Sequence, residues 1–207
     1  MRKIVFQMMA TLNGRLDKPY EWLHSVCEDQ YQRIDRIYAD YDTVLVGRTT
    51  YEEMAAYWPT ALSETEGTET NRKMARRMRD YRKLVFSKQK GHGLTEWQHV
   101  EPVIAADDQA LRDFLVSLKE RLGKDIHLSG GASFAQSVIG LGLVDEYHFF
   151  LYPAVSPGAA WFERWPNQQG LRLIASEAYE NGVVWLHYAA QPKETKAQPD
   201  SFSELLS

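Results

Sequence analysis

The segment from Asp125 to Ala135 (DIHLSGGASFA) most restricts what this chain can fold into. An apolar run precedes two adjacent glycines, Gly130 and Gly131, and a helical pattern then continues to Ile139. Adjacent glycines let the backbone approach a ligand closely because they carry no Cβ. The first turn of a helix offers free N–H groups and the positive end of the helix dipole. The segment therefore suits phosphate binding; the alternative is a tight strand-to-helix turn that binds nothing.

The composition restricts the class of protein. A chain of 207 residues suggests one domain with a sizeable core, or at most two small domains. With 44% hydrophobic and 25% charged residues, the composition is that of an ordinary globular protein. The net charge of −4 and the lack of a dense Lys/Arg segment argue against nucleic-acid binding. Cys27 is the single cysteine, which excludes an intrachain disulfide and a thiolate metal cluster.

The histidines and the N-terminus give further expectations. None of the six histidines lies three or four residues from another, so no helical metal-binding pair forms and we expect no metal site. His127 and His148 lie in apolar runs, where a core histidine is the commoner role. The N-terminal apolar run is too short for a signal peptide, and no segment approaches the length of a membrane span. We therefore expect a cytoplasmic protein.

The hydrophobic pattern predicts strands alternating with helices. Strands are predicted at residues 3–9, 43–47, 84–88, 97–100, 125–128, 144–152, 171–179 and 183–190. Helices are predicted at residues 27–41, from 48 onward with capping-box spacing at Thr49 or Thr50, at 72–81, from 107 or 108 to 122, and at 132–139. Residues 60–71 are polar and are predicted to form an irregular loop.

This alternation predicts an α/β fold with a mixed, mostly parallel central sheet of about eight strands, flanked by helices. Asn181-Gly182 joins the last two strands as a C-terminal antiparallel hairpin at one edge of the sheet. We expect one domain over residues 1–190 and a polar C-terminal tail over residues 191–207.

Three strand ends carry residues that suit phosphate groups. They are Gly47-Arg48-Thr49-Thr50, Ser87-Lys88 and Gly130-Gly131-Ala132-Ser133. Ligands of open α/β sheets bind beyond the carboxyl ends of the strands, and arginine can bridge two phosphate oxygens. The three ends together could hold the phosphates of a dinucleotide. A G-x-G-x-x-G motif is absent, which argues against an ordinary Rossmann domain.

The order of these motifs resembles that of a known family. Four motifs follow one another along the chain: Gly47-Arg48-Thr49-Thr50-Tyr51-Glu52, Leu84-Val85-Phe86-Ser87, Leu128-Ser129-Gly130-Gly131 and Gly142-Leu143-Val144-Asp145-Glu146. This succession resembles the dihydrofolate-reductase-like proteins. It is most similar to the branch that contains the RibD C-terminal reductase domain of riboflavin biosynthesis and its stand-alone relatives. The resemblance covers roughly residues 2–190.

The resemblance implies NADPH as the cofactor and a homodimer as the assembly. The adenosine-side phosphates would contact Arg48, Thr49 and Thr50, and the adenine ribose with its 2′-phosphate would contact Ser87 and Lys88. The pyrophosphate would be held by Gly130, Gly131, Ala132 and Ser133, with Gly47 and Ser129 beside them. The nicotinamide would be flanked by backbone groups near Met9 and Leu16. It also implies a cis peptide between Gly130 and Gly131, a costly bond outside proline.

The implied activity is hydride transfer from NADPH to a small heterocyclic or carbonyl substrate, as in 5-amino-6-(5-phosphoribosylamino)uracil reductase and dihydrofolate reductase. Asp29 is our candidate catalytic residue, and Trp22, Tyr51 and Trp58 are candidates for the wall of the substrate pocket. The pterin-binding acid of dihydrofolate reductases aligns near Tyr31, which argues against dihydrofolate as the substrate.

Two alternatives to a reductase remain at this point. The chain could be a catalytically inactive NADP(H)-binding module, because the substrate side of the motif set is weak. It could also be an interaction domain that binds no nucleotide, although Arg48, Ser87 and the paired glycines argue against this.

Overall fold

The computed structural model describes residues 1–16, 18–63, 68–90, 93–129, 131–158 and 169–191. The strands are β1 (Ile4–Thr11), β2 (Tyr41–Gly47), β3 (Arg82–Ser87), β4 (Val100–Ile104), β5 (Asp125–Leu128), β6 (Glu146–Tyr152), β7 (Leu171–Ala178) and β8 (Val184–Ala190). The α-helices are α1 (Glu28–Ala39), α2 (Arg48–Ser63), α3 (Glu69–Asp80), α4 (Asp108–Glu120) and α5 (Ala132–Gly140). A short 3₁₀ turn, Pro19–Glu21, precedes α1.

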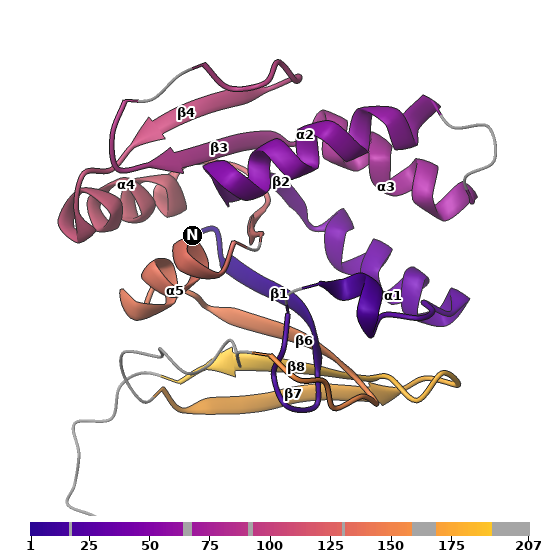
Figure 1. The fold of residues 1–207 in the computed structure, drawn as a ribbon. Coiled ribbons are helices and arrows are strands. Elements are labelled where there is room, and N and C mark those ends of the chain that lie inside the picture. Colours follow the sequence, from indigo (N-terminus) through magenta and orange to yellow (C-terminus); the bar gives the residue numbers. More distant parts are fainter. Residues whose placement is uncertain (17, 64–67, 91–92, 130, 159–168, 192–207) are drawn as a thin grey trace, which may run out of the picture.

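All eight strands belong to one sheet in the order β4-β3-β2-β5-β1-β6-β8-β7 (Figure 1). Every neighbouring pair from β4 to β6 is parallel, whereas β8 runs antiparallel to both β6 and β7. The predicted fold class, a mostly parallel sheet of about eight strands with a C-terminal antiparallel hairpin, is thereby confirmed. Of the predicted tail, only Gln191 lies within the described residues.

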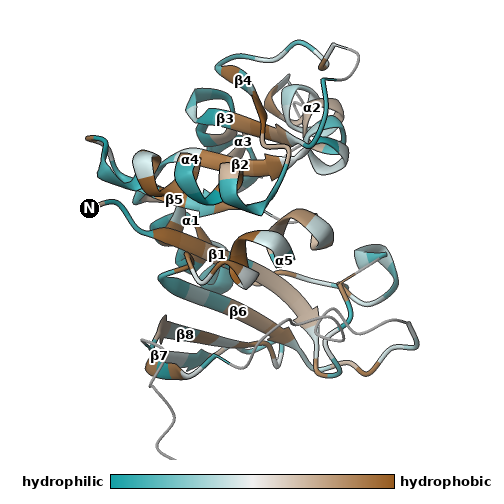
Figure 2. Cartoon of the chain, turned by 90° about the vertical axis from the view of Figure 1, so that its left-hand side faces the viewer, coloured by the Kyte–Doolittle hydropathy of each residue, from teal (hydrophilic) through white to brown (hydrophobic). Residues whose placement is uncertain are grey.

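The helices cover the two faces of the sheet (Figure 1), and each face has its own core. One core cluster packs between the sheet and helices α4 and α5, with Leu115 and Val138 fully buried. The other packs beneath α1, α2 and α3 and includes Val44 and Tyr51. In Figure 2, strands β1 and β2 are hydrophobic along most of their length. Strands buried on both faces lack the alternation of a half-exposed strand, as the sequence indicated.

Three local predictions were wrong. Helix α2 extends to Ser63 and α3 begins at Glu69, so the predicted loop at residues 60–71 is helical at both ends. The Thr68 side chain caps α3 by accepting a hydrogen bond from the Asn71 N–H at 3.1 Å. Strand β4 begins at Val100, where the sequence suggested residues 97–100. Because α2 begins at Arg48, the two threonines lie in its first turn rather than at the N-cap of a capping box.

None of the helices among the described residues is both long enough and apolar enough to cross a membrane.

The central strand β5 carries a buried histidine, His127, whose ring stacks on Tyr41 with 5.2 Å between centroids. Its Nε2 lies 3.1 Å from the Tyr38 hydroxyl oxygen. Burial lowers the pKa of His127 from 6.5 to about 3, so the ring stays neutral in the folded protein.

The unfolding free energy should fall as the pH drops below about 6.5, because the unfolded chain then protonates His127 and the folded protein does not. His127→Phe keeps an aromatic ring against Tyr41 but removes the titrating group. Between about pH 7 and pH 5, we expect the unfolding free energy of this variant to fall by about 2 kcal/mol less than that of the wild type. Urea denaturation at both pH values measures the difference. Equal losses in the two proteins would contradict this role of His127.

Candidate functional site

The carboxyl ends of adjacent strands lead directly into helices. Helix α2 begins at Arg48, immediately after β2, and α5 begins at Ala132, shortly after β5. Strands β2 and β5 are parallel neighbours, so these two helix starts lie close together. A cavity of about 480 Å³, which we call the strand-end cavity, lies at this place. The start of α4, at Asp107 and Asp108, also lines it.

The structure brings together most of the residues predicted to bind a cofactor. The predicted residues that line the strand-end cavity are Gly47, Arg48, Thr49, Thr50, Ser87, Lys88, Gly131, Ala132 and Ser133. Ser129 instead donates its backbone N–H to the Leu45 carbonyl at 3.0 Å, outside the cavity lining. Met9 and Leu16 do not line it either. Gly130, and with it the predicted cis peptide, lies outside the described residues.

Two glycines allow the helix starts to pack against each other. Gly131 has a φ of 94°, and a Cβ there would lie 2.8 Å from the Thr50 hydroxyl oxygen. A Cβ on Gly47 would lie 3.1 Å from the Cβ of Phe134. Larger residues would therefore push α5 away from α2 and change the space between their first turns.

The cavity combines both signs of charge. Arg48 and Lys88 contribute cations, and Asp107 and Asp108 contribute carboxylates. Asp107 is already engaged as the N-cap of α4, since its Oδ1 accepts a hydrogen bond from the Ala110 N–H at 2.8 Å. The first turns of α2, α4 and α5 add N–H groups without intrahelical partners and three positive dipole ends. An anionic ligand with several charged groups fits these donors.

Sequence reasoning missed one side of this cavity. The residues that it did not identify are Phe86, Ala105, Asp107, Asp108, Leu111, Phe134 and Ser137. Phe86 and Phe134 stack with 4.7 Å between ring centroids and form an aromatic wall. The end of β4 at Ile104, followed three residues later by the N-cap of α4 at Asp107, was a signal of the same kind as the three strand ends that were used.

The residues predicted for the substrate side lie elsewhere, in the core cluster beneath α1, α2 and α3. Tyr51 is fully buried and donates its hydroxyl hydrogen bond to the Thr95 carbonyl. Trp58 is half-buried against Tyr57. Trp22 is buried and packs edge-on against Tyr152, with 5.5 Å between centroids. None of the three predicted residues lines the strand-end cavity.

Tyr152, at the end of β6, lies at the centre of a set of contacts between segments that are far apart in the sequence. The buried Gln30 donates from Nε2 to the Tyr152 hydroxyl oxygen at 2.8 Å and accepts at Oε1 from Asn181 at 3.0 Å. The Tyr152 hydroxyl in turn lies 3.8 Å from the sulfur of Met9. Asp29, the predicted catalytic residue, is exposed, and its neighbour Gln30 takes the inward-facing position. The role predicted for Asp29 stays a prediction.

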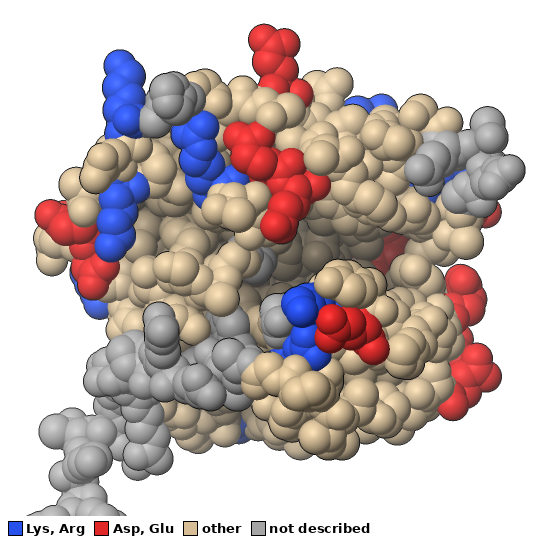
Figure 3. Space-filling view, viewed as in Figure 1, with Lys and Arg blue, Asp and Glu red and all other residues tan. Residues whose placement is uncertain are grey.

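The molecule is hollowed on the face seen in Figure 3, between the half that carries α2 and the half that carries β1 and β6. Lys, Arg, Asp and Glu side chains gather along the rim of this hollow. The carboxyl end of β1 reaches it, so the hollow continues the line of strand ends from β2 toward β6.

Glu146, His148 and His187 form the one group among the described residues whose ligand atoms lie within 4.8 Å of one another, as metal ligands do. The Trp185 indole N–H donates to Nδ1 of His148 at 3.1 Å, so the neutral ring carries its proton on Nε2. Glu146 accepts hydrogen bonds from Lys3 at 2.6 Å and from His187 at 2.8 Å.

Both nitrogens of His148 are therefore committed, and the Lys3 ammonium adds a positive charge beside the carboxylate. This arrangement suits a hydrogen-bond network better than a cation. Sequence reasoning considered only helical spacing and missed the group. Two-residue spacing within a strand puts Glu146 and His148 on one face. The expectation that the chain binds no metal stays a prediction.

Gly131→Ala should destabilise the protein by more than Gly142→Ala does. Both glycines have positive φ, at 94° and 68°, so both changes carry a backbone cost of about 1–2 kcal/mol. Only at Gly131 does the new Cβ meet another group, the Thr50 hydroxyl. Adding Thr50→Ala should restore part of the lost stability in Gly131→Ala and none in Gly142→Ala. Urea denaturation of the wild type and of five variants, Thr50→Ala alone included, tests this. If the effects of Gly131→Ala and Thr50→Ala simply add in the double variant, the two helix starts do not press on each other.

Comparisons with known proteins agree with the fold. The RibD C-terminal domain family matches residues 2–185 of the chain. The Bacillus subtilis (strain 168) protein YyaP is 27% identical over 188 residues, which cover 90% of this chain and 94% of YyaP. A pyrimidine reductase-like protein from Corynebacterium diphtheriae has a similar structure, with a TM-score of 0.63, 13% identity and 92% of each chain covered.

Dihydrofolate reductase from Enterococcus faecalis, solved as a complex with NADP(H) and RAB-propyl, is also similar, with a TM-score of 0.59 at 11% identity over 92% of this chain and 97% of that one. At these identities the structural likeness shows the fold alone. The family match spans nearly the whole chain and confirms the resemblance drawn from the ordered motifs. The chain therefore belongs to the RibD C-terminal domain family, and this membership supports a reductase-like function.

Proposed function

We propose that this chain is an NADPH-dependent reductase that passes a hydride to a small heterocyclic or carbonyl substrate. The observation that carries the proposal is the strand-end cavity. Three helix starts, two cations and nine of the residues predicted to bind a cofactor surround one space of about 480 Å³. A dinucleotide is a ligand with several anionic groups and suits such a site.

The residues present fit this cofactor. Arg48, Ser87 and Lys88 would hold the adenosine portion with its 2′-phosphate, and the first turn of α5, beside Gly131, would hold the pyrophosphate. The missing Cβ of Gly131 keeps that first turn close to Thr50 and open to the cavity. When bound, NADPH supplies the hydride, so the protein contributes binding, orientation and exclusion of water.

The names of the structural neighbours support the same proposal. One is a pyrimidine reductase-like protein, and another is a dihydrofolate reductase complexed with NADP(H). A heterocyclic substrate is the class that these names share. The hollow beside the end of β1 offers space for the substrate.

One observation favours the second candidate, a catalytically inactive NADP(H)-binding module. The inward-facing residue at the start of α1 is Gln30, whose amide cannot supply a proton to a substrate. The exposed Asp29 would have to supply it in the reductase. The two candidates share cofactor binding and differ in whether bound NADPH is oxidised.

NADPH should raise the melting temperature of the protein, and NADH should raise it far less, because only NADPH offers a 2′-phosphate to Ser87 and Lys88. Arg48→Leu should weaken NADPH binding by roughly 10- to 100-fold, the value of a lost charged hydrogen bond. Arg76→Leu, an exposed arginine on α3, is the matched control and should leave binding unchanged. Thermal-shift titration measures all four cases. Equal stabilisation of the wild type and Arg48→Leu would contradict the cavity assignment, whereas binding without oxidation of any offered heterocycle would favour the inactive module.

We also propose that two copies pair through the β7 edge of the sheet. Leu173 and Ile174 on this edge strand are 49% and 44% exposed, and no strand of the described residues pairs with the outer side of β7, whose backbone groups could pair with another chain. A cavity of about 620 Å³ on the same end of the sheet is lined mainly by apolar side chains, among them Phe149, Leu186 and Leu171. A second copy would cover these side chains.

Sedimentation equilibrium should show a dimer for the wild type and a shift to monomer for the Leu173→Glu, Ile174→Lys double variant. The added charges would have to be buried in the interface, which is costly. Leu122→Glu, at a fully exposed leucine outside this edge, should stay dimeric. A monomeric wild type at the highest soluble concentration would rule the pairing out.

A further inference from the structure

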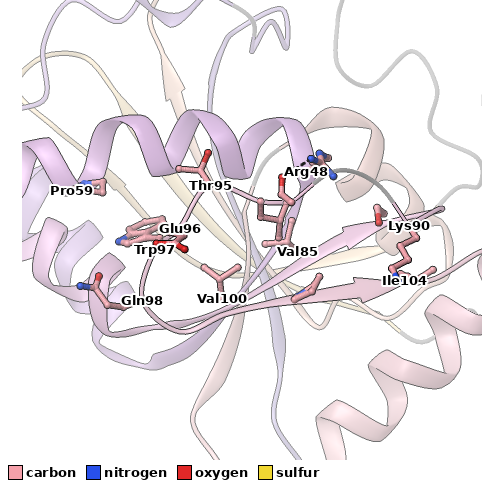
Figure 4. Close-up of a pocket in the computed structure, with 14 residues that line it drawn as sticks. Arg48, Pro59, Val85, Lys90, Thr95, Glu96, Trp97, Gln98, Val100 and Ile104 are labelled. Carbon is pink, nitrogen blue, oxygen red and sulfur yellow. Dashed lines mark hydrogen bonds between the residues drawn. The ribbon is translucent and has the colours of Figure 1, made fainter.

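A second cavity, of about 850 Å³, lies on the α1–α3 side of the sheet, near its β4 edge (Figure 4). Val85 of β3 and Pro102 of β4 are register partners and form part of its floor. Residues 93–98 form its roof, and α2 contributes a wall at Arg48 and Pro59. We call this space the β4 cavity.

The β4 cavity is distinct from the strand-end cavity. Among the described residues, the two share only Arg48 and Ser87. Val85, in the β4 cavity, belongs to the core cluster beneath α1, α2 and α3. Its neighbour Phe86, in the strand-end cavity, belongs to the cluster beneath α4 and α5. The cavities therefore lie on opposite sides of β3.

The roof of the β4 cavity is fixed to α2. Arg48 donates from Nη2 to the Gly93 carbonyl at 3.0 Å. The Tyr51 hydroxyl donates to the Thr95 carbonyl, and the Thr95 hydroxyl donates to the Glu52 carboxylate. These three bonds hold the roof open over the floor, so a ligand would find the cavity already formed.

Trp97, at one end of the β4 cavity, is held from below by a buried lysine. Lys83 donates from Nζ to the carbonyls of Arg79, Tyr81 and Gln98 at 2.9, 2.8 and 2.7 Å. The same ammonium lies 4.3 Å from the centroid of the Trp97 ring. The indole is therefore a fixed aromatic surface rather than a mobile one.

Charges of opposite sign lie at the two ends of this cavity. Figure 4 shows Arg48 and Lys90 at one end, with Glu96 and Trp97 at the other. Between them the floor is aliphatic, from Val85, Val100 and Pro102. An anionic group would be attracted toward Arg48 and Lys90 and repelled by Glu96, while an apolar body would cover the floor between them.

We propose that the β4 cavity is a separate binding site for a small aromatic anion, such as an arene carboxylate or sulfonate. The anionic group binds Arg48 and Lys90, and the ring lies over Val85 and Pro102 toward Trp97. Pockets of this size that are mostly apolar and have a few polar groups are typical small-molecule sites. This proposal goes beyond the reductase activity and does not depend on it.

Naphthalene-1-sulfonate serves as the probe, and the signals of the six tryptophan indole N–H groups in a ¹H–¹⁵N spectrum serve as the readout. Trp97→Phe assigns the Trp97 signal. We expect this signal to shift with the probe and to saturate. An unmoved Trp97 signal at millimolar probe would overturn the proposal.

Matched variants locate the probe. Pro102→Trp fills the floor and should weaken probe binding at least tenfold, whereas Glu101→Gln, at a residue of the same strand whose side chain pairs with Arg82, should not. Lys90→Gln is a milder surface change and should weaken probe binding several-fold. It provides the test if the Pro102→Trp variant does not fold.

The cofactor provides the last arm of the experiment. Pro102→Trp should keep the thermal stabilisation by NADPH, because Pro102 does not line the strand-end cavity. A saturable Trp97 shift in a protein that binds no NADPH supports this site and removes the proposed function. Probe binding that survives Pro102→Trp and Lys90→Gln but is displaced by NADPH places the probe in the strand-end cavity and overturns the proposal.

Discussion

The parallel pairing of β5 with β1 on one side and β2 on the other is the constraint on which the candidate site depends. Strand β5 has four residues, three of them buried, and Ile126 aligns with both Ile4 and Thr43. At the amino end of β1, two carboxylates hold the strands in register. Asp125 accepts a hydrogen bond from the Lys3 N–H at 2.8 Å, and Asp145 accepts one from the Ile4 N–H at 2.7 Å. A shift of register by one residue would turn Ile126 and Leu128 away from their core.

This register decides where the helix starts meet. With β2 and β5 aligned, the chain leaves both strands at the same level and enters α2 and α5 side by side. The close approach explains why Gly131 carries no side chain, since its Cβ would touch Thr50. One packing arrangement therefore brings together the backbone N–H groups, the helix dipoles and the arginine of α2. The register of the sheet thus determines which chemical groups the site offers.

Much of this arrangement could be predicted from the sequence because its signals are local. Hydrophobic runs ending in Gly47, Ser87 and Gly130-Gly131 indicate strand ends, and a parallel sheet brings strand ends to one edge. The polar residues 60–71 misled the prediction, since Thr68 acts as a helix cap and not as part of a loop. Local polarity does not distinguish these two roles.

Other features depend on contacts between distant segments and could not be read locally. Tyr152 gathers Trp22, Gln30 and Met9, three residues from two other parts of the chain. The inward position of Gln30, where Asp29 was expected, depends on the angle at which α1 packs on the sheet. A shift of one residue around a helix rotates a side chain by about 100° and exchanges a buried position for an exposed one.

Arg48 links the two cavities, because it is the one charged residue among the described positions that lines both. A guanidinium has five N–H donors, and one bond to the Gly93 carbonyl leaves others for a ligand on either side. That same bond fixes the roof of the β4 cavity to the first turn of α2. The side chain that supplies a cation to the strand-end cavity therefore also positions the roof of the β4 cavity, so one arginine contributes to the geometry of both.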